Sequence, residues 1–300
     1  MPKQNIAAAL WLSTGGLAVM SAMSAAIHAV AGEVPTGQII FWRSFVALLP
    51  TLTYLAFRRE LGQSIRTRYP HKHLVRGLLG CAVMFFSFVS LRYLSVGLAT
   101  ALTYLAPILS IAAAMIFLRE RPGATIFFGV VLGFAGIVLM LFPALIGTEL
   151  RDGTLTGVGA GVAMAATNAL SRVQVKDLTR TEPPASIALS FALICSLVGL
   201  ASSLLGWVDL TATQFMLLAG AGLLGGLGHV LMMESVARAP VSVLAPYEYT
   251  GIIWAFGFDL VLLGIVPSPW ALAGALVVVA AAALVAYGQG RFGRGITASA

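Results

Sequence analysis

Long apolar runs, separated by short polar or basic segments, fill this chain from end to end. Each run is close to the ~20 residues that an α-helix needs to cross the hydrocarbon core of a bilayer. The pattern predicts ten membrane-spanning helices, at residues 6–31, 36–57, 73–92, 96–118, 124–142, 154–175, 185–206, 213–236, 242–264 and 269–288. No intervening segment is long enough for a soluble domain. The predicted fold class is therefore an all-α integral membrane protein in contact with the lipid bilayer.

The first predicted helix has one feature of a cleaved signal peptide, because it ends in small residues at Ala29-Val30-Ala31. Its apolar stretch is longer than the ~7–15 residues of a signal-peptide core. We therefore expect this helix to be retained.

Composition excludes several classes of protein. Hydrophobic residues make up 59% of the chain and charged residues only 10%, against roughly 25% charged residues in soluble domains. The net charge of +7 is not gathered in one stripe, so no nucleic-acid partner is expected. Cys81 and Cys195 both lie inside apolar segments, which argues against a disulfide framework or a metal site.

No catalytic or nucleotide-binding motif occurs in the structural setting that its chemistry requires. The run from Gly220 to Gly225 matches a dinucleotide fingerprint, but it lies within a predicted span and follows no strand. Small residues there are expected to allow close helix packing instead. Walker, zinc-type His/Glu and serine-elbow motifs do not occur. We predict no enzyme activity, no cofactor and no ATP-driven transport by this chain alone.

The basic residues predict an orientation. With the amino terminus inside, fifteen of the 18 lysines and arginines fall on the cytoplasmic side. Only Arg92 and Arg151 fall on the other side, and Arg43 lies within a span. This imbalance follows the positive-inside rule and predicts that both termini are cytoplasmic.

The two halves of the chain are related. Sliding residues 91–142 onto residues 236–287, a shift of 145, gives eight identities, among them Pro122 with Pro267 and Gly129 with Gly274. We expect one repeat in residues 1–147 and a second in residues 148–300. Five helices per repeat is an odd number, so the repeats should have inverted topology, an architecture associated with alternating access.

Several short motifs resemble a known family. They are LRYL at 91–94, YLAP at 104–107 and LRERP at 118–122 in the first half, with GH at 228–229, ARAP at 237–240 and APYEY at 245–249 in the second. In order and spacing they resemble the paired EamA-type repeats of the drug/metabolite transporter superfamily. One departure is Ile265, where the family often has a glutamate before the proline of the second repeat. Glu120 keeps the first-repeat version.

The resemblance covers essentially the whole chain and is greatest to bacterial amino-acid exporters, including those for aromatic amino acids. It implies ten helices around a central cavity, in the bacterial inner membrane, as a monomer or homodimer. The expected function is export of amino acids. The alternatives are export of other small metabolites or drugs by the same superfamily, and, in a different class, a channel or a non-transporting membrane scaffold.

Polar residues form stripes on three predicted helices, and such faces should avoid lipid. The stripes are Thr14, Ser21, Ser24 and His28 in the first helix, Thr100, Thr103, Pro107 and Ser110, with Tyr104 beside them, in the fourth, and Met164, Asn168 and Ser171 in the sixth. Hydroxyl groups can instead bond to the preceding helical turn. Three such stripes in one chain favour a shared cavity that binds substrate.

Four ionisable residues lie within predicted spans and are candidates for ion pairing or coupling: Arg43, His229, Glu248 and Asp259. Glu248 is expected to bind a substrate ammonium group or to carry a coupling proton, with an ion pair or hydrogen bond to Arg43 or His229 as the alternative. Asp259 is expected to lie near the outer surface and to be solvated.

Apolar and kinked positions complete the predicted site. Met20, Phe85, Tyr104 and Met164 are expected to contact an apolar part of the substrate, although ordinary helix packing is the alternative for each. Pro107 and Pro246 interrupt the fourth and ninth helices and are expected to kink them, either for packing or to free a carbonyl for a ligand.

Overall fold

The structure is a computed structural model, and it describes residues 6–64, 67, 69–106, 108–109, 124–146, 153–179, 181–239, 244, 247–248 and 250–297. This part of the chain is built from helices and contains no β-strand. The predicted all-α membrane class in two inverted repeats is confirmed, and the described helices are consistent with the ten that the sequence predicts.

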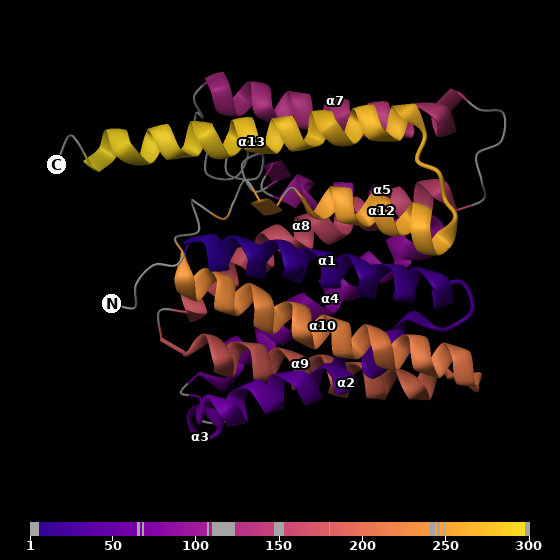
Figure 1. The fold of residues 1–300 in the computed structure, drawn as a ribbon, viewed down its shortest axis with the longest axis vertical. Coiled ribbons are helices and arrows are strands. Elements are labelled where there is room, and N and C mark those ends of the chain that lie inside the picture. The colour runs from indigo at the N-terminus through magenta and orange to yellow at the C-terminus, as the bar shows by residue number, and fades with distance from the viewer. Residues whose placement is uncertain are drawn as a thin grey trace.

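The helices run side by side across Figure 1, and α1 begins at the same end of the bundle at which α13 ends. The described helices are α1 (Ile6–Val30), α2 (Thr36–Phe57), α3 (Leu61–Ser64), α4 (Pro70–Tyr93), α5 (Val96–Thr103), α7 (Ala124–Ile146), α8 (Thr154–Leu178), α9 (Pro184–Ala201), η1 (Ser202–Leu205), α10 (Ala212–Arg238), α12 (Gly251–Leu263) and α13 (Pro269–Thr297). Most begin or end within three residues of the predicted bounds. The 3-10 turn η1 replaces the last turn expected of the seventh predicted helix.

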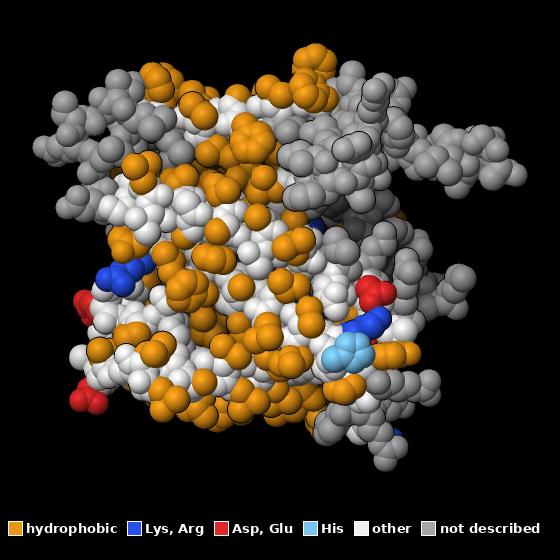
Figure 2. All heavy atoms as spheres, turned by 180° about the vertical axis from the view of Figure 1, so that it is seen from behind, with side chains coloured by type: hydrophobic (Ala, Val, Ile, Leu, Met, Phe, Trp, Pro, Cys, Tyr) orange, Lys and Arg blue, Asp and Glu red, His pale blue; other side chains and the backbone are white. Residues whose placement is uncertain are grey.

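Length and hydropathy fit a membrane protein. Among the described residues, five helices are long and apolar enough to cross a bilayer: Ile6–Val30, Thr36–Phe57, Pro70–Tyr93, Ala185–Leu205 and Ala212–Arg238. The outer surface agrees with this, because hydrophobic side chains cover its broad middle and the coloured charged groups gather at the two ends of the helices (Figure 2). Such a belt is what a lipid environment requires.

Helix packing follows the relation between the two repeats. By order of the long helices along the chain, the first helix of each repeat is α1 or α8, and the third is α4 or α10. Helix α1 packs against α10, and its counterpart α8 packs against α4. The second helices of the two repeats, α2 and α9, pack against each other, and so do the fifth helices, α7 and α13. Exchanging the repeats therefore maps this set of contacts onto itself, as a pseudo-two-fold axis would.

The helices α7 and α13 form a close pair at one edge of the bundle (Figure 1). A Cβ atom added at Gly136 would lie 2.9 Å from the backbone nitrogen of Val278 and 3.0 Å from the carbonyl oxygen of Gly274. No side chain fits between the two backbones at this crossing, so glycine is needed there. The other helices surround the space that holds the candidate site.

Candidate functional site

A central cavity of about 330 Å³ lies between α1, α5, α8, α10 and the segment that leads into α12. Its described lining consists of Leu17, Met20, Ser21, Ser24, Thr100, Thr103, Tyr104, Asn168, Arg172, Met232, Glu248 and Gly251. Its volume is at the lower end of the range for small-molecule sites. Both repeats contribute to it, as expected of a transporter site built where repeats meet.

Eight of the eleven residues predicted for the cavity line it: Met20, Ser21, Ser24, Thr100, Thr103, Tyr104, Asn168 and Glu248. Whether they bind substrate stays a prediction. Three others lie elsewhere in the fold. The Thr14 hydroxyl donates to the Leu10 carbonyl at 2.9 Å, Phe85 is 45% exposed on the outside of α4, and Met164 is only 2% exposed within the packed core.

The remaining stripe and kink residues also lie away from this lining. Nδ1 of His28 is 2.6 Å from the carbonyl oxygen of Leu91, at the junction of α1 and α4. Ser171 is buried. The predicted kinks at Pro107 and Pro246 lie outside the described residues, as does Ser110.

Hydroxyl groups of the cavity bond to backbone carbonyls. Ser24 donates to the Met20 carbonyl at 3.1 Å, and Thr103 donates to the Thr100 carbonyl at 2.5 Å. These hydroxyl groups therefore bond to the preceding helical turn, which was the alternative to a place on a substrate cavity. This bonding coexists with a place on the cavity wall, so these oxygens retain lone pairs that can accept hydrogen bonds from a ligand.

Tyr104 joins the two repeats at the cavity wall. Its hydroxyl donates to the backbone carbonyl of Glu248 at 2.8 Å. A Cβ atom added at Gly251 would lie 2.9 Å from the same hydroxyl oxygen, so the ring fits because this residue is glycine. Ser21 adds a longer bond, 3.4 Å, to the Gly251 carbonyl. The position of Glu248 is thereby fixed relative to α1 and α5.

Two residues of opposite charge line the central cavity, Glu248 and Arg172. In the described part of the chain, no hydrogen bond or ion pair engages the carboxylate of Glu248 or the guanidinium of Arg172. Arg172 was not predicted, because it was counted among the cytoplasmic basic residues. Its spacing of four from Asn168 was the available signal, since residues four apart share one helix face.

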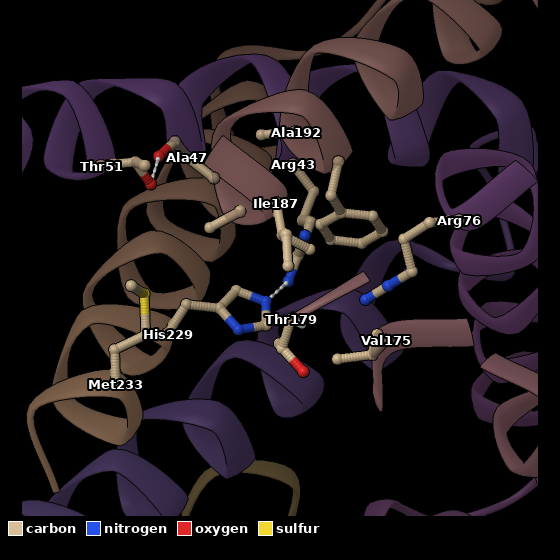
Figure 3. A pocket seen from close by; sticks show the side chains of 12 residues that line it. Arg43, Ala47, Thr51, Arg76, Val175, Thr179, Ile187, Ala192, His229 and Met233 are labelled. Atoms are coloured by element: carbon tan, nitrogen blue, oxygen red, sulfur yellow. Dashed lines mark hydrogen bonds between the residues drawn. The ribbon is translucent and has the colours of Figure 1, made fainter. Parts of the chain in front are cut away.

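Arg43 and His229 lie at a second cavity, of about 180 Å³, between α2, α4, α8, α9 and α10 (Figure 3). Nη2 of Arg43 lies 3.2 Å from Nε2 of His229 and donates to it. The two side chains therefore contact each other. Among the described residues neither contacts Glu248, so the pairing that the sequence offered as an alternative for Glu248 is not observed.

Asp259 is buried, with 1% of its surface exposed, so the prediction that it is solvated is wrong. Its carboxylate accepts hydrogen bonds from the backbone N–H groups of Val96 at 2.8 Å and Gly97 at 2.7 Å. A carboxylate at a helix amino terminus satisfies free N–H groups and the positive end of the helix dipole. Asp259 therefore caps α5, and its role is to join α12 to α5.

The sequence itself matches a family in two places. The EamA-like transporter family matches residues 7–142 and residues 153–287, which together cover most of the chain. The chain belongs to the EamA-like transporter family. The resemblance inferred from the motifs is confirmed, and this EamA-like transporter is a multi-pass membrane protein of a bacterial transporter family.

Similar proteins include transporters of different named substrates. This EamA-like transporter is 24% identical to the Pseudopaline exporter CntI of Pseudomonas aeruginosa over 87% of this chain and 89% of that protein. It is 25% identical to the Riboflavin transporter of Vibrio cholerae over 92% of each chain. It is 22% identical to the S-adenosylmethionine uptake transporter of Rickettsia bellii over 84% of each chain.

A solved crystal structure supports the fold. It superimposes with a TM-score of 0.63 at 18% identity and covers 92% of this chain and 96% of its own. At that identity the similarity concerns the fold alone. The arrangement of helices around the central cavity of this EamA-like transporter therefore has a counterpart among known structures.

Proposed function

We propose that this EamA-like transporter exports amino acids, aromatic ones included, across the bacterial inner membrane by alternating access. One observation carries the proposal: the Glu248 carboxylate and the Arg172 guanidinium line the same cavity and are not bonded to each other. An amino acid at neutral pH carries one positive and one negative group. A cavity lined by one charge of each sign, with no bond between the two, complements that distribution.

Glu248 is the proposed partner of the substrate ammonium group. An ammonium has three N–H donors and no acceptor, so it needs several oxygens around it. The hydroxyl oxygens of Ser24 and Thr103 line the same cavity and have already donated their protons to backbone carbonyls. They are therefore available as acceptors beside the carboxylate.

Arg172 is the proposed partner of the substrate carboxylate. A guanidinium can donate two parallel hydrogen bonds to one carboxylate, which fixes orientation as well as charge. Asn168 lies one turn earlier on the same face of α8 and lines the cavity with it. Its amide N–H group can add a third donor.

Adaptable apolar residues are proposed to hold the variable side chain. Leu17, Met20 and Met232 line the cavity and are partly buried. Thioether groups adjust to different shapes and make favourable contacts with aromatic rings. These residues suit a substrate range that is broad in side chain and strict in its charged groups.

Orientation and direction belong to the same proposal. The imbalance of fifteen basic residues against two supports cytoplasmic termini, and export is the activity that the family resemblance implies. Export of another small metabolite is the second candidate, because the relatives are named for pseudopaline, riboflavin and S-adenosylmethionine. A channel would differ from both in lacking saturable, concentrative transport.

The test uses everted membrane vesicles or proteoliposomes and radiolabelled phenylalanine. Two competitors each lack one charged group: phenethylamine has no carboxylate, and 3-phenylpropionate has no ammonium. Losing a charge-assisted hydrogen bond costs about 1.5–3 kcal/mol, so each analogue should compete about tenfold or more weakly than phenylalanine. Saturable, concentrative uptake of phenylalanine would separate transport from channel conduction.

Two variants test which residue binds each charged group of the substrate. Arg172→Gln should abolish the preference for phenylalanine over phenethylamine, and Glu248→Gln should abolish the preference over 3-phenylpropionate. Equal competition by all three compounds in the unaltered protein would refute amino-acid recognition and favour another metabolite.

A further inference from the structure

The cavity that contains Arg43 and His229, called here the basic cavity, holds a second cationic group that has no described role. Its lining is Arg43, Ala47, Thr51, Arg76, Val175, Thr179, Ile187, Ala188, Phe191, Ala192, His229 and Met233. Arg43, Arg76 and the His229 ring all lie towards the same space in Figure 3. None of these lining residues is acidic.

Arg43 is deeply buried, with 5% of its surface exposed. One end of its guanidinium contacts His229 at 3.2 Å, and Nη1 lies 3.9 Å from the sulfur of Met84. Its Nε has no hydrogen-bond partner in the described structure. A Cβ atom added at Gly225 would lie 3.1 Å from this Nε, so the glycine makes room for the guanidinium beside α10.

Arg76 lies on the other side of the basic cavity, from α4. Its guanidinium carbon is 4.7 Å from the centre of the Phe191 ring, a cation–π arrangement. Its Nε and Nη1 are buried and have no hydrogen-bond partner in the described part of the chain. A side chain at Gly80 would collide with both Phe191 and Arg76, so this glycine too makes room for a guanidinium.

The nearby carboxylates are engaged elsewhere. Asp177 pairs with Lys72 at 2.7 Å, and Glu182 lies 3.8 Å from Nε2 of His73. The adjoining open space, which shares His229 with the basic cavity, contains Glu60, and Glu60 pairs with Arg58 at 3.6 Å. No ion pair to Arg43 or Arg76 occurs among the described residues.

Two guanidinium groups that find no counter-ion among the described residues are unfavourable within a membrane-embedded bundle. A buried charge is normally paired, because burial removes its hydration. Buried donors left without acceptors add a further cost, because they have lost their bonds to water. An anion between Arg43 and Arg76 would remove both costs, and the open volume of about 180 Å³ leaves space for one.

We propose that the basic cavity binds a small organic carboxylate. Guanidinium groups favour the planar, two-oxygen geometry of a carboxylate. The walls around the two arginines are mostly apolar, with Ile187, Phe191 and Met233 among them, so they suit the short hydrocarbon part of such an anion better than a fully hydrated inorganic ion. The carboxylate group belongs either to a transported amino acid or to a separate small metabolite.

This site is distinct from the central cavity and does not depend on the proposed substrate. Helix α10 contributes to both, with Met232 lining the central cavity and His229 and Met233 lining the basic one. Arg76 lies seven residues into α4, at the end of the bundle that also carries Lys72.

The experiment measures binding of propionate to the purified full-length protein in detergent by isothermal titration calorimetry. Propionamide is the probe of equal shape without charge, and chloride is the probe of charge without a carboxylate. We expect propionate to bind at least tenfold more tightly than either. Equal affinity for propionamide, or equal affinity for chloride, would overturn the assignment.

Arg76→Gln should weaken propionate binding at least tenfold. Arg92→Gln is the matched control, because Arg92 also stacks on an aromatic ring, Tyr93, but lies exposed at the opposite end of α4. Ala188→Leu provides a second test that keeps both charges and fills the cavity, so it should also reduce binding. Each variant must elute as a single peak in size-exclusion chromatography before titration.

Arg172→Gln separates this site from the central cavity. Loss of propionate binding in Arg172→Gln, with normal binding in Arg76→Gln, would place the anion in the central cavity and refute the proposal. With Arg172→Gln protein, displacement of propionate by phenylalanine would identify a transported amino acid as the source of the carboxylate. Absence of displacement would identify a separate carboxylate. Either source satisfies the proposal.

Discussion

The hydroxyl of Tyr104 donates a 2.8 Å hydrogen bond to the backbone carbonyl of Glu248, and this bond ties α5 of the first repeat to the segment before α12 of the second. The two residues are 144 positions apart in sequence and line the same cavity. The bond therefore helps to determine where the only acidic side chain of the described cavity lining is held.

Tyr104→Phe tests this bond. The substitution keeps the ring and removes one hydrogen bond, whose net contribution is about 1 kcal/mol. We expect export of phenylalanine to fall about fivefold while the protein still folds, because the Glu248 segment loses its tether. Initial rates from preloaded proteoliposomes, normalised to protein amount, provide the measurement. An unchanged rate would show that the bond does not position the cavity wall.

Glu248→Gln tests the only carboxylate described in the central cavity. The amide keeps size and hydrogen-bonding capacity and removes the charge, so transport should fall by about tenfold to a hundredfold if the carboxylate pairs with an ammonium. Asp209→Asn is the control, because Asp209 is an exposed carboxylate in the segment between η1 and α10. Transport at the unaltered rate in Glu248→Gln would remove this residue from the proposed mechanism.

Met20→Ala and Met164→Ala should behave differently. Met20 lines the cavity, so its truncation should change the preference among amino-acid side chains, with aromatic export weakened relative to threonine export. Met164 is packed in the core, and its truncation should cost about 2–5 kcal/mol of stability and lower export of all substrates together. Efflux of each amino acid, with thermal unfolding of both variants, distinguishes the two. A shift in substrate preference in Met164→Ala alone would reverse this assignment.

Asp259→Asn should destabilise the junction of α5 and α12. The amide offers one acceptor where the carboxylate supplies two, and its NH₂ group would face a backbone N–H that then lacks a partner. The expected cost is about 2 kcal/mol. Thermal unfolding in detergent should show a lower midpoint, and Asp209→Asn again serves as the control. Equal midpoints for the two variants would contradict the capping role.

Orientation can be tested with single cysteines at described positions, after Cys81 and Cys195 have been replaced by alanine. Arg58→Cys follows α2, and Arg92→Cys lies near the end of α4; both positions are exposed. An impermeant thiol reagent added to whole cells should label Arg92→Cys and leave Arg58→Cys unlabelled until the membrane is opened. The reverse pattern would invert the proposed topology.

The sequence predicted the fold well because bilayer thickness constrains helix length strongly. The helix expected at 36–57 is observed as α2, Thr36–Phe57. In water, hydrophobic periodicity competes with many tertiary arrangements, whereas an apolar run of about 20 residues has few alternatives in a membrane. Details at helix ends, such as the 3-10 turn η1, depend on local packing and were not predictable from hydropathy.

Some residues of the site were placed correctly from the sequence and others were not. Spacing along one helix identifies a shared face, and this placed Ser24, Thr100 and Asn168 correctly beside the cavity. Spacing does not show which face meets which neighbour, so Met164 was expected on the cavity wall although it packs in the core. Asp259 was expected in water because its partners, the N–H groups of α5, are more than 160 residues away in sequence.

The edge pair α7 and α13 contributes none of the described lining residues of either cavity. Its two backbones approach so closely at Gly136 and Gly274 that no side-chain layer separates them. This EamA-like transporter therefore has a two-helix unit, α7 and α13, which packs against α5 at the edge of the bundle and contributes to the core but not to the described wall of either cavity. Substitutions on the exposed surface of α7 and α13 are expected to change contacts with lipid more than they change ligand binding.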